Sequence, residues 1–183
     1  MNFEKKYQQF VSRVLKEKKY FNVHQVPQIK KVFLNIGVGE GATDKKIVAS
    51  FVKQLSLIAG QQAVSTFSHD SIADFQLREG VAIGCKVTIT SKERFFPFLE
   101  KIIRVVLPNT VAFPGISKQS FDGRGNLTFA LNSQICFPEL KYDMIYKQKG
   151  MTITVVTSAK SDEGAYWMFV ALGFPFASKT KGS

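Results

Sequence analysis

The stretch 120–126, Ser-Phe-Asp-Gly-Arg-Gly-Asn, combines residue types that suit the binding of an anion. Gly123 and Gly125 flank Arg124, and glycine gives a loop access to positive φ angles and to close backbone approach. The planar guanidinium of arginine matches the geometry of phosphate oxygens. The stretch holds no nucleophile with a general base beside it. We therefore predict a shaped loop that faces an anionic partner and performs no catalysis.

A second glycine-rich stretch, residues 37–42, approximates the dinucleotide-binding fingerprint. Gly37, Gly39 and Gly41 lie between a strand-like and a helix-like segment. That fingerprint also requires an acidic residue about 20 positions later, to bind the ribose. Residues 45–69 contain no Asp or Glu. The pattern therefore favours a tight strand-to-helix turn, and a nucleotide-binding enzyme is the alternative.

The other reactive residue types lack partners at useful spacings. His24 and His69 are the only histidines, and neither has ligands at a zinc-binding spacing. Asp70 and Asp74 are better explained as solvated or capping groups than as a general acid and base. We expect no metal, no cofactor and no enzymatic activity.

Charge and composition favour a polyanionic partner. The 183 residues carry a formal net charge of +11, with a pI of about 9.7. Residues 1–31 contain eight basic and two acidic residues, so more than half of the net charge lies in that sixth of the chain. A one-sided excess of this size is typical of proteins that bind nucleic acid. A general basic RNA chaperone would show the same excess.

The hydrophobic fraction of 45%, with 17 phenylalanines, is sufficient for a packed core and argues against disorder. The length favours one domain over residues 1–183, with a basic helix at 3–20 and a short basic tail at 177–183. Cys85 and Cys136 lie in strand-like runs and are interpreted as reduced structural thiols. The sequence shows no membrane-spanning run and no secretory signal. The first residues are interpreted as part of the mature protein.

Hydrophobic periodicity locates the elements that position these residues. Strands are predicted at 31–38, 63–67, 83–90, 127–131 and 151–155. Helices are predicted at 3–20, from Asp44 to Gly60, at 93–106 with Pro97 in the first turn and Pro108 after the end, and from Ser161 to Gly173. The polar loop 68–80 and the Gly/Pro/Ser-rich loop 108–125 connect them. We predict an α+β fold with a single antiparallel or mixed sheet, helices on one face and long functional loops.

Two predicted strands present polar groups on their less hydrophobic faces. Phe33 and Asn35 share such a face, and Lys86 and Thr88 lie opposite the apolar residues of the strand at 83–90. Amides, hydroxyls and aromatics on a sheet can contact RNA backbone, 2′-hydroxyls and unstacked bases. The alternative is a face that is simply open to water.

Several ordered strings resemble the large ribosomal subunit protein five family of the bacterial and organellar type. They extend from residue 22 to residue 176, and they are NVHQVP (22–27), VFLNIGVGE (32–40), LIAGQ (57–61), SIADFQLREG (71–80), IGCKVT (83–88), PG (114–115), FDGRGN (121–126), FPE (137–139), YD (142–143), GM (150–151) and LGFPF (172–176).

The resemblance implies a structural RNA-binding protein of the central protuberance, with contacts to 5S-type rRNA and large-subunit rRNA and to neighbouring large-subunit proteins. The positions that match the family's 5S rRNA contacts are Asn35, Gln61, Phe75 and Thr88. The loop 68–80, with Ser71, Phe75, Leu77 and Arg78, matches the family's contact to P-site transfer RNA. The loop around 109–124 matches its bridge to small-subunit protein thirteen.

The chain departs from the family pattern in the loop 68–80. His69, Asp70 and Gln76 stand where the family usually has a basic pair and often a further Lys. An acid near a phosphate is repulsive, so these residues argue against the transfer-RNA contact. The loop chemistry and the many phenylalanines favour an organellar member in the mitochondrial matrix, with a bacterial cytoplasm or a plastid as alternatives.

Overall fold

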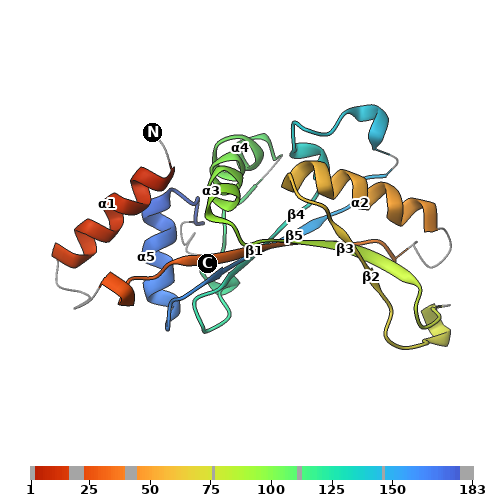
Figure 1. Cartoon of the computed structure of the whole chain (residues 1–183), viewed down its shortest axis with the longest axis horizontal. Helices are drawn as coiled ribbons and strands as arrows, with labels where there is room; N and C mark the ends of the chain where they lie inside the picture. Colours follow the sequence, from red (N-terminus) through yellow and green to blue (C-terminus); the bar gives the residue numbers. More distant parts are fainter. Residues whose placement is uncertain are drawn as a thin grey trace, which may run out of the picture. The chain divides into compact units, whose positions relative to one another are not determined.

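The computed structural model describes residues 3–16, 23–39, 45–75, 77–110, 113–145 and 147–177. It has an α+β fold whose five strands form one antiparallel sheet in the order β2-β3-β1-β5-β4 (Figure 1). The strands are β1 (Ile29–Gly37), β2 (Val64–Phe67), β3 (Ala82–Ile89), β4 (Leu127–Leu131) and β5 (Met151–Thr157). The main helices are α1 (Phe3–Lys16), α2 (Lys45–Ala59), α3 (Lys92–Lys101) and α5 (Asp162–Leu172). This confirms the predicted fold class.

The chain divides into two compact units. Unit 1 comprises Met1–Val32, Thr90–Phe129 and Thr154–Ser183, and unit 2 comprises Phe33–Ile89 and Ala130–Ile153. Strands β1, β4 and β5 each contribute residues to both units. The prediction of one domain over the whole chain stays a prediction. The predicted basic helix ends at Lys16 in the described part, and the tail 178–183 lies outside the described residues.

In unit 2, one helix packs on a face of the sheet. Helix α2 lies against β3 and β2 (Figure 1). Its inward residues Val48, Phe51, Leu55 and Ile58 are buried, as are the alternate β3 residues Cys85, Val87 and Ile89. Burial of side chains of this size contributes about 1.5–3 kcal/mol each. Desolvation raises the pKa of the Cys85 thiol to about 12, as befits a structural thiol.

Two glycines of unit 2 have separate reasons for their positions. Gly60 has a φ of +62° directly after α2, as predicted for the helix C-terminus. At Gly84 a Cβ would lie 2.7 Å from the carbonyl oxygen of Ile36 and 2.9 Å from Oγ1 of Thr66. Only glycine therefore lets β1, β2 and β3 approach so closely at this point.

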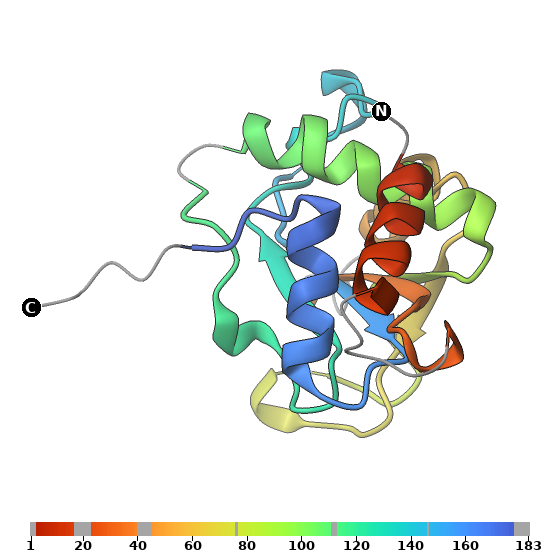
Figure 2. The ribbon, with the colours of Figure 1, turned by 90° about the vertical axis from the view of Figure 1, so that its left-hand side faces the viewer.

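In unit 1, α1 packs against α5 and α3 (Figure 2). The ring of Phe3 lies 5.9 Å from the ring of Phe96, centre to centre. The hydroxyl of Tyr7 donates to the carbonyl of Pro27 at 3.0 Å, and burial raises the pKa of Tyr7 to about 12. The face of α1 that carries Lys5 is exposed, so the predicted amphipathic basic helix is confirmed where it is described.

The predicted placement of the prolines in the helix at 93–106 was wrong. Pro97 is the sixth residue of α3 rather than a first-turn residue. After α3 the backbone widens into a π-helical segment, η4 (Ile102–Val106), and a last turn, α4 (Leu107–Asn109), contains Pro108. The N–H of Leu107 donates to the carbonyl of Ile102, and this longer-range bond carries the helix past the point where the sequence predicts its end.

The short 3-10 turns lie in the connections between these elements. They are η1 (Val23–Gln25), η3 (Ala73–Phe75), η5 (Lys118–Ser120), η6 (Gln134–Cys136) and η7 (Tyr142–Met144). Gln134 is fully buried: its Nε2 donates to the carbonyl of Lys147 at 2.7 Å, and its Oε1 accepts from the N–H of Lys149 at 2.6 Å. One buried amide therefore fixes both sides of the connection between β4 and β5. Among the described residues no helix is long and apolar enough to cross a membrane.

Candidate nucleic-acid interface

The face of unit 2 opposite α2 brings several predicted contact residues into one row. The N–H of Val38 donates to the carbonyl of Ile83 at 2.8 Å, which sets the antiparallel register of β1 and β3. Three residues back along β1 and three residues forward along β3, the same register places Asn35 opposite Lys86. Lys86 in turn pairs with Val64 of β2. Asn35 and Lys86 are both exposed, so an amide and an ammonium group lie side by side on an open surface.

Thr88, two residues after Lys86, lies on the same face of β3, and Gln61 bonds to its backbone. Gln61 lies in the connection between α2 and β2, and its Nε2 donates to the backbone carbonyl of Thr88 at 3.1 Å. Both side chains are half-buried. The bond holds the Gln61 side chain against β3, which leaves its amide oxygen as an acceptor. Asn35, Gln61, Lys86 and Thr88, defined here as the open face, offer amide, hydroxyl and ammonium groups.

The other predicted contacts do not join the open face within the described structure. The backbone of Phe75 lies in η3, and its side chain lies outside the described residues, as does all of Gln76. Arg124 is exposed but belongs to unit 1. Gly37 is the last residue of β1 and Gly39 follows it, while residues 40–42 of the predicted glycine-rich turn lie outside the described residues.

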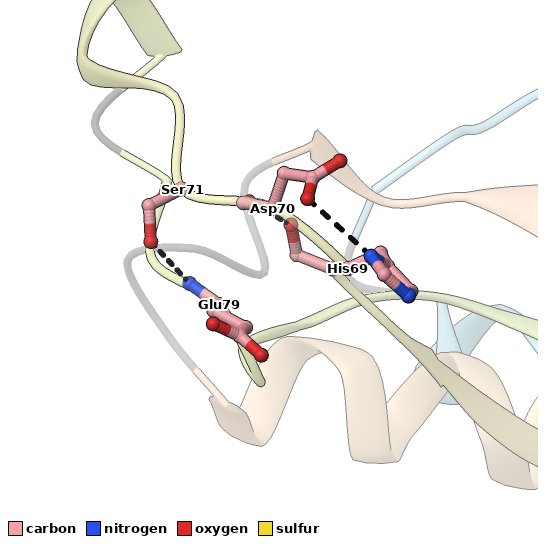
Figure 3. Close-up of polar contacts among 5 residues, drawn as sticks. His69, Asp70, Ser71 and Glu79 are labelled. Carbon is pink, nitrogen blue, oxygen red and sulfur yellow. Dashed lines mark hydrogen bonds and ion pairs between the residues drawn. The ribbon is translucent and has the colours of Figure 1, made fainter.

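The loop 68–80 is closed by its own hydrogen bonds. Ile72 and Leu77 exchange two backbone bonds of 2.9 and 3.0 Å. Oγ of Ser71 accepts from the N–H of Glu79 at 2.9 Å, so this hydroxyl serves the loop itself (Figure 3). Leu77 is half-buried and Arg78 is exposed. Of the four residues predicted to face transfer RNA, Arg78 is therefore the one that offers a cation.

Asp70 and Asp74 both point into solvent, as predicted for solvated groups. Nδ1 of His69 lies 3.3 Å from Oδ1 of Asp70, and both side chains are almost fully exposed (Figure 3). Exposed pairs of this kind contribute little to stability. Within the described part of the chain, no group of three or more His, Cys, Asp or Glu could hold a metal ion.

The loop 121–126 in unit 1 has the predicted special backbone, with φ angles of +82° at Gly123 and +77° at Gly125. Oδ1 of Asp122 accepts from the N–H groups of Arg124 at 2.9 Å and Asn126 at 3.0 Å. Nδ2 of Asn126 donates to Oδ2 of Asp122 at 2.6 Å. This side-chain bond, together with the two backbone donors, lowers the pKa of Asp122.

A second carboxylate completes the loop from the start of α5. Oδ1 of Asp162 accepts from the N–H of Gly125 at 2.7 Å, and Oδ2 accepts from the N–H of Gly123 at 3.1 Å. The N–H groups of residues 123–126 thus all donate to the chain's own carboxylates. The expectation of a loop with a fixed shape is confirmed, but its backbone donors are already used internally. Only the exposed Arg124 side chain remains to meet an anion.

Sequence reasoning missed the role of Asp162. The sequence predicts a helix cap formed by Ser161 with Asp162 and Glu163, and Ser161 does occupy the N-cap position. Its side chain makes no capping hydrogen bond, however, and Asp162 bonds to a loop 37 to 39 residues earlier in the chain. No spacing rule links residues so far apart, so the sequence held no signal for this contact.

Two family models together match most of the chain. The first, described as Ribosomal protein L5, matches residues 22–78. The second, which describes the C-terminus of the same ribosomal protein family, matches residues 82–176. The first match contains Asn35 and Gln61 of the open face, and the second contains Lys86, Thr88 and the loop 121–126.

Proposed function

The chain belongs to the ribosomal protein L5 family, a family of non-enzymatic structural proteins of the large ribosomal subunit, and on that premise we propose that its open face binds 5S-type rRNA. The observation that carries the proposal is the row of Asn35 and Lys86, exposed side by side, with Gln61 fixed against Thr88. Amides and hydroxyls can bond to bases and 2′-hydroxyls, while the ammonium group neutralises a phosphate. Membership in this family excludes the nucleotide-dependent enzyme.

The test measures binding of the full chain to a 5S-type RNA by filter binding. Asn35→Ala combined with Thr88→Ala should weaken binding roughly 10- to 100-fold, because two hydrogen-bonding groups are lost. The matched control is Thr128→Ala with Asn132→Ala, which changes exposed residues of the same types elsewhere. If both double variants bind equally well, the open face is not the RNA site.

Salt and RNA identity separate this function from a general RNA chaperone. Affinity should fall steeply between low and high salt, because phosphate contacts release counterions. A 5S-type RNA should also bind more tightly than an unrelated RNA of equal length. Equal affinity for both RNAs would favour the chaperone instead.

We propose further contacts in unit 1. Arg124 projects from a loop whose backbone is fixed by two carboxylates, and this favours a phosphate of large-subunit rRNA as its partner. The segment 109–124, whose described residues include the exposed Lys118 and Gln119, is the proposed bridge to small-subunit protein thirteen. Contact of the loop 68–80 with P-site transfer RNA stays a prediction, with Arg78 as its cationic residue.

We also propose a mitochondrial ribosome as the location. The 17 phenylalanines and the acidic character of the loop 68–80 support it. Co-sedimentation of the protein with the mitochondrial large subunit in a fractionated cell lysate is the expected result. Recovery with cytoplasmic or plastid large subunits would contradict it.

A further inference from the structure

We propose that helices α1 and α5 of unit 1 form a second RNA-binding surface, at which Trp167 stacks on an unpaired base and the basic side of α1 neutralises the adjacent phosphates. This surface belongs to unit 1, whereas the open face belongs to unit 2. The inference therefore does not depend on RNA binding at the open face.

The two units differ widely in charge. Unit 1 contains 17 basic and seven acidic residues, a net charge of +10, whereas unit 2 contains eight basic and seven acidic residues, a net charge of +1. The open face therefore lies in the unit that has almost no net charge. The electrostatic part of the affinity for RNA depends on the number of phosphates that a protein neutralises. The charge of unit 1 thus indicates a phosphate-binding surface outside the open face.

Helix α1 runs beside α5 in the opposite direction (Figure 2). A Cβ at Gly173, the residue that follows α5, would lie 3.4 Å from Nζ of Lys6. Arg13 is exposed and lies about two helical turns after Lys6, so both side chains project from the same side of α1. Because the two helices are antiparallel, Arg13 is level with the part of α5 that lies about two turns before Gly173. That part contains Tyr166 and Trp167.

Trp167, the only tryptophan of the chain, lies at the surface of α5. It is 56% exposed, and Val170, three residues later on the same side of the helix, is 40% exposed. The ring of Tyr166 packs edge-on against the Trp167 ring at 5.7 Å, centre to centre. An indole can stack on any of the four bases, because every base has a π-face. An exposed indole with Arg13 at the same level therefore matches one unpaired nucleotide, with its base on the ring and its phosphate at the guanidinium.

The position of Glu163 favours a nucleotide over an acidic protein segment. Glu163 is exposed and lies four residues before Trp167, on the same side of α5. An acidic helix that packed along α5 would bring its carboxylates close to Glu163, and like charges repel. A nucleotide requires only the indole and Arg13, so its phosphate can lie toward α1 and away from this carboxylate.

The fluorescence of Trp167 tests the stacking contact directly, because no other tryptophan contributes. The full chain is titrated with a single-stranded oligouridylate and, separately, with a duplex RNA of equal length. The single strand should quench the indole emission strongly and the duplex only weakly, because the bases of the duplex are paired and stacked on one another. Equal quenching by the two RNAs, or no quenching by either, would overturn the proposal.

The anisotropy of a labelled oligouridylate separates the stacking contribution from the charge contribution. Trp167→Ala should weaken binding about tenfold, and Trp167→Phe, which keeps an aromatic ring, should restore most of the affinity. Lys6→Gln with Arg13→Gln should reduce the slope of log K against log salt concentration by about 1.4. Lys46→Gln with Lys53→Gln removes the same charge from exposed residues of α2 and is the matched control. An equal reduction by the two pairs would show a general charge effect and would refute the surface.

Two further measurements separate this surface from the alternatives. Asn35→Ala with Thr88→Ala should leave the quenching of Trp167 unchanged, because both residues belong to unit 2. Loss of the quenching in that variant would mean that the two surfaces are not independent, and would overturn the proposal. A peptide of alternating glutamate and leucine should not displace the labelled RNA. Displacement at a lower concentration than unlabelled oligouridylate requires would make an acidic protein segment the partner instead.

Discussion

The loop 121–126 of unit 1 and the loop 68–80 of unit 2 both carry aspartates, but their carboxylates have opposite environments. Asp122 and Asp162 accept the backbone N–H groups of residues 123–126. Asp70 and Asp74 point into solvent. In the first loop the carboxylates accept hydrogen bonds from the backbone and hold its shape, whereas in the second the carboxylates of Asp70 and Asp74 are exposed to solvent. An aspartate in a loop therefore stabilises the fold only where backbone N–H groups lie within hydrogen-bonding distance of its carboxylate.

The largest effect is expected from Gly125→Ala, which tests how tightly the first loop is built. Gly125 has a φ of +77°, and a Cβ there would lie 2.6 Å from Cβ of Ala159. Backbone strain and overpacking together should lower the free energy of unfolding by about 3 kcal/mol. Urea unfolding of both proteins measures this change.

Gly123→Ala is the matched control for that prediction. Gly123 has a similar φ of +82°, but a Cβ there would meet none of the described atoms within 4 Å. The expected loss is about 1 kcal/mol, from the backbone conformation alone. Equal losses for the two variants would mean that close packing does not hold Gly125 in place.

The next effect compares the two loops directly through one chemical change. Asp162→Asn removes a carboxylate that accepts two backbone N–H groups, and one of them would then face an amide NH₂. We expect a loss of about 2 kcal/mol in the free energy of unfolding. Asp74→Asn, at an exposed site of the loop 68–80, should change the free energy of unfolding by less than about 0.5 kcal/mol. Thermal and urea unfolding measure both variants. Similar losses for Asp162→Asn and Asp74→Asn would remove the distinction between the loops.

The smallest effect is a pH dependence from Asp122. Its pKa in the folded protein lies below the ordinary value of 3.8, so its contribution to stability is present above pH 3.8 and is lost as the pH falls further. The difference in unfolding free energy between the native chain and Asp122→Asn should therefore shrink below that pH. Urea titrations at several pH values measure it.

Asn126→Ala provides the control for the pH experiment. This change removes the side-chain donor that contributes most to the lowered pKa of Asp122. In that background the pH-dependent part of the difference should be smaller. A pH-dependent part of unchanged size would assign the effect to another group.

Much of the fold could be predicted because it depends on local pattern. The alternation of hydrophobic residues along β4 and β5 in the sequence matches the alternation of buried residues in the structure. Gly60 and Gly173 end their helices with positive φ angles, as predicted. The exposure of Asn35 followed from its position between buried neighbours in β1. The π-helical segment before Pro108 could not be predicted, because a change in hydrogen-bond register leaves the hydrophobic pattern almost unaltered.

The sequence by itself determined the helices and strands, the basic character of the chain and the family to which it belongs, because periodicity, charge and ordered motifs are local properties. It also determined that Asn35 and Lys86 lie on polar strand faces. Only the tertiary structure decided that these two residues are neighbours and that Asp162 holds the loop 121–126. Those facts depend on the register of the strands and on contacts between residues far apart in the sequence. Only the folded chain brings such residues together.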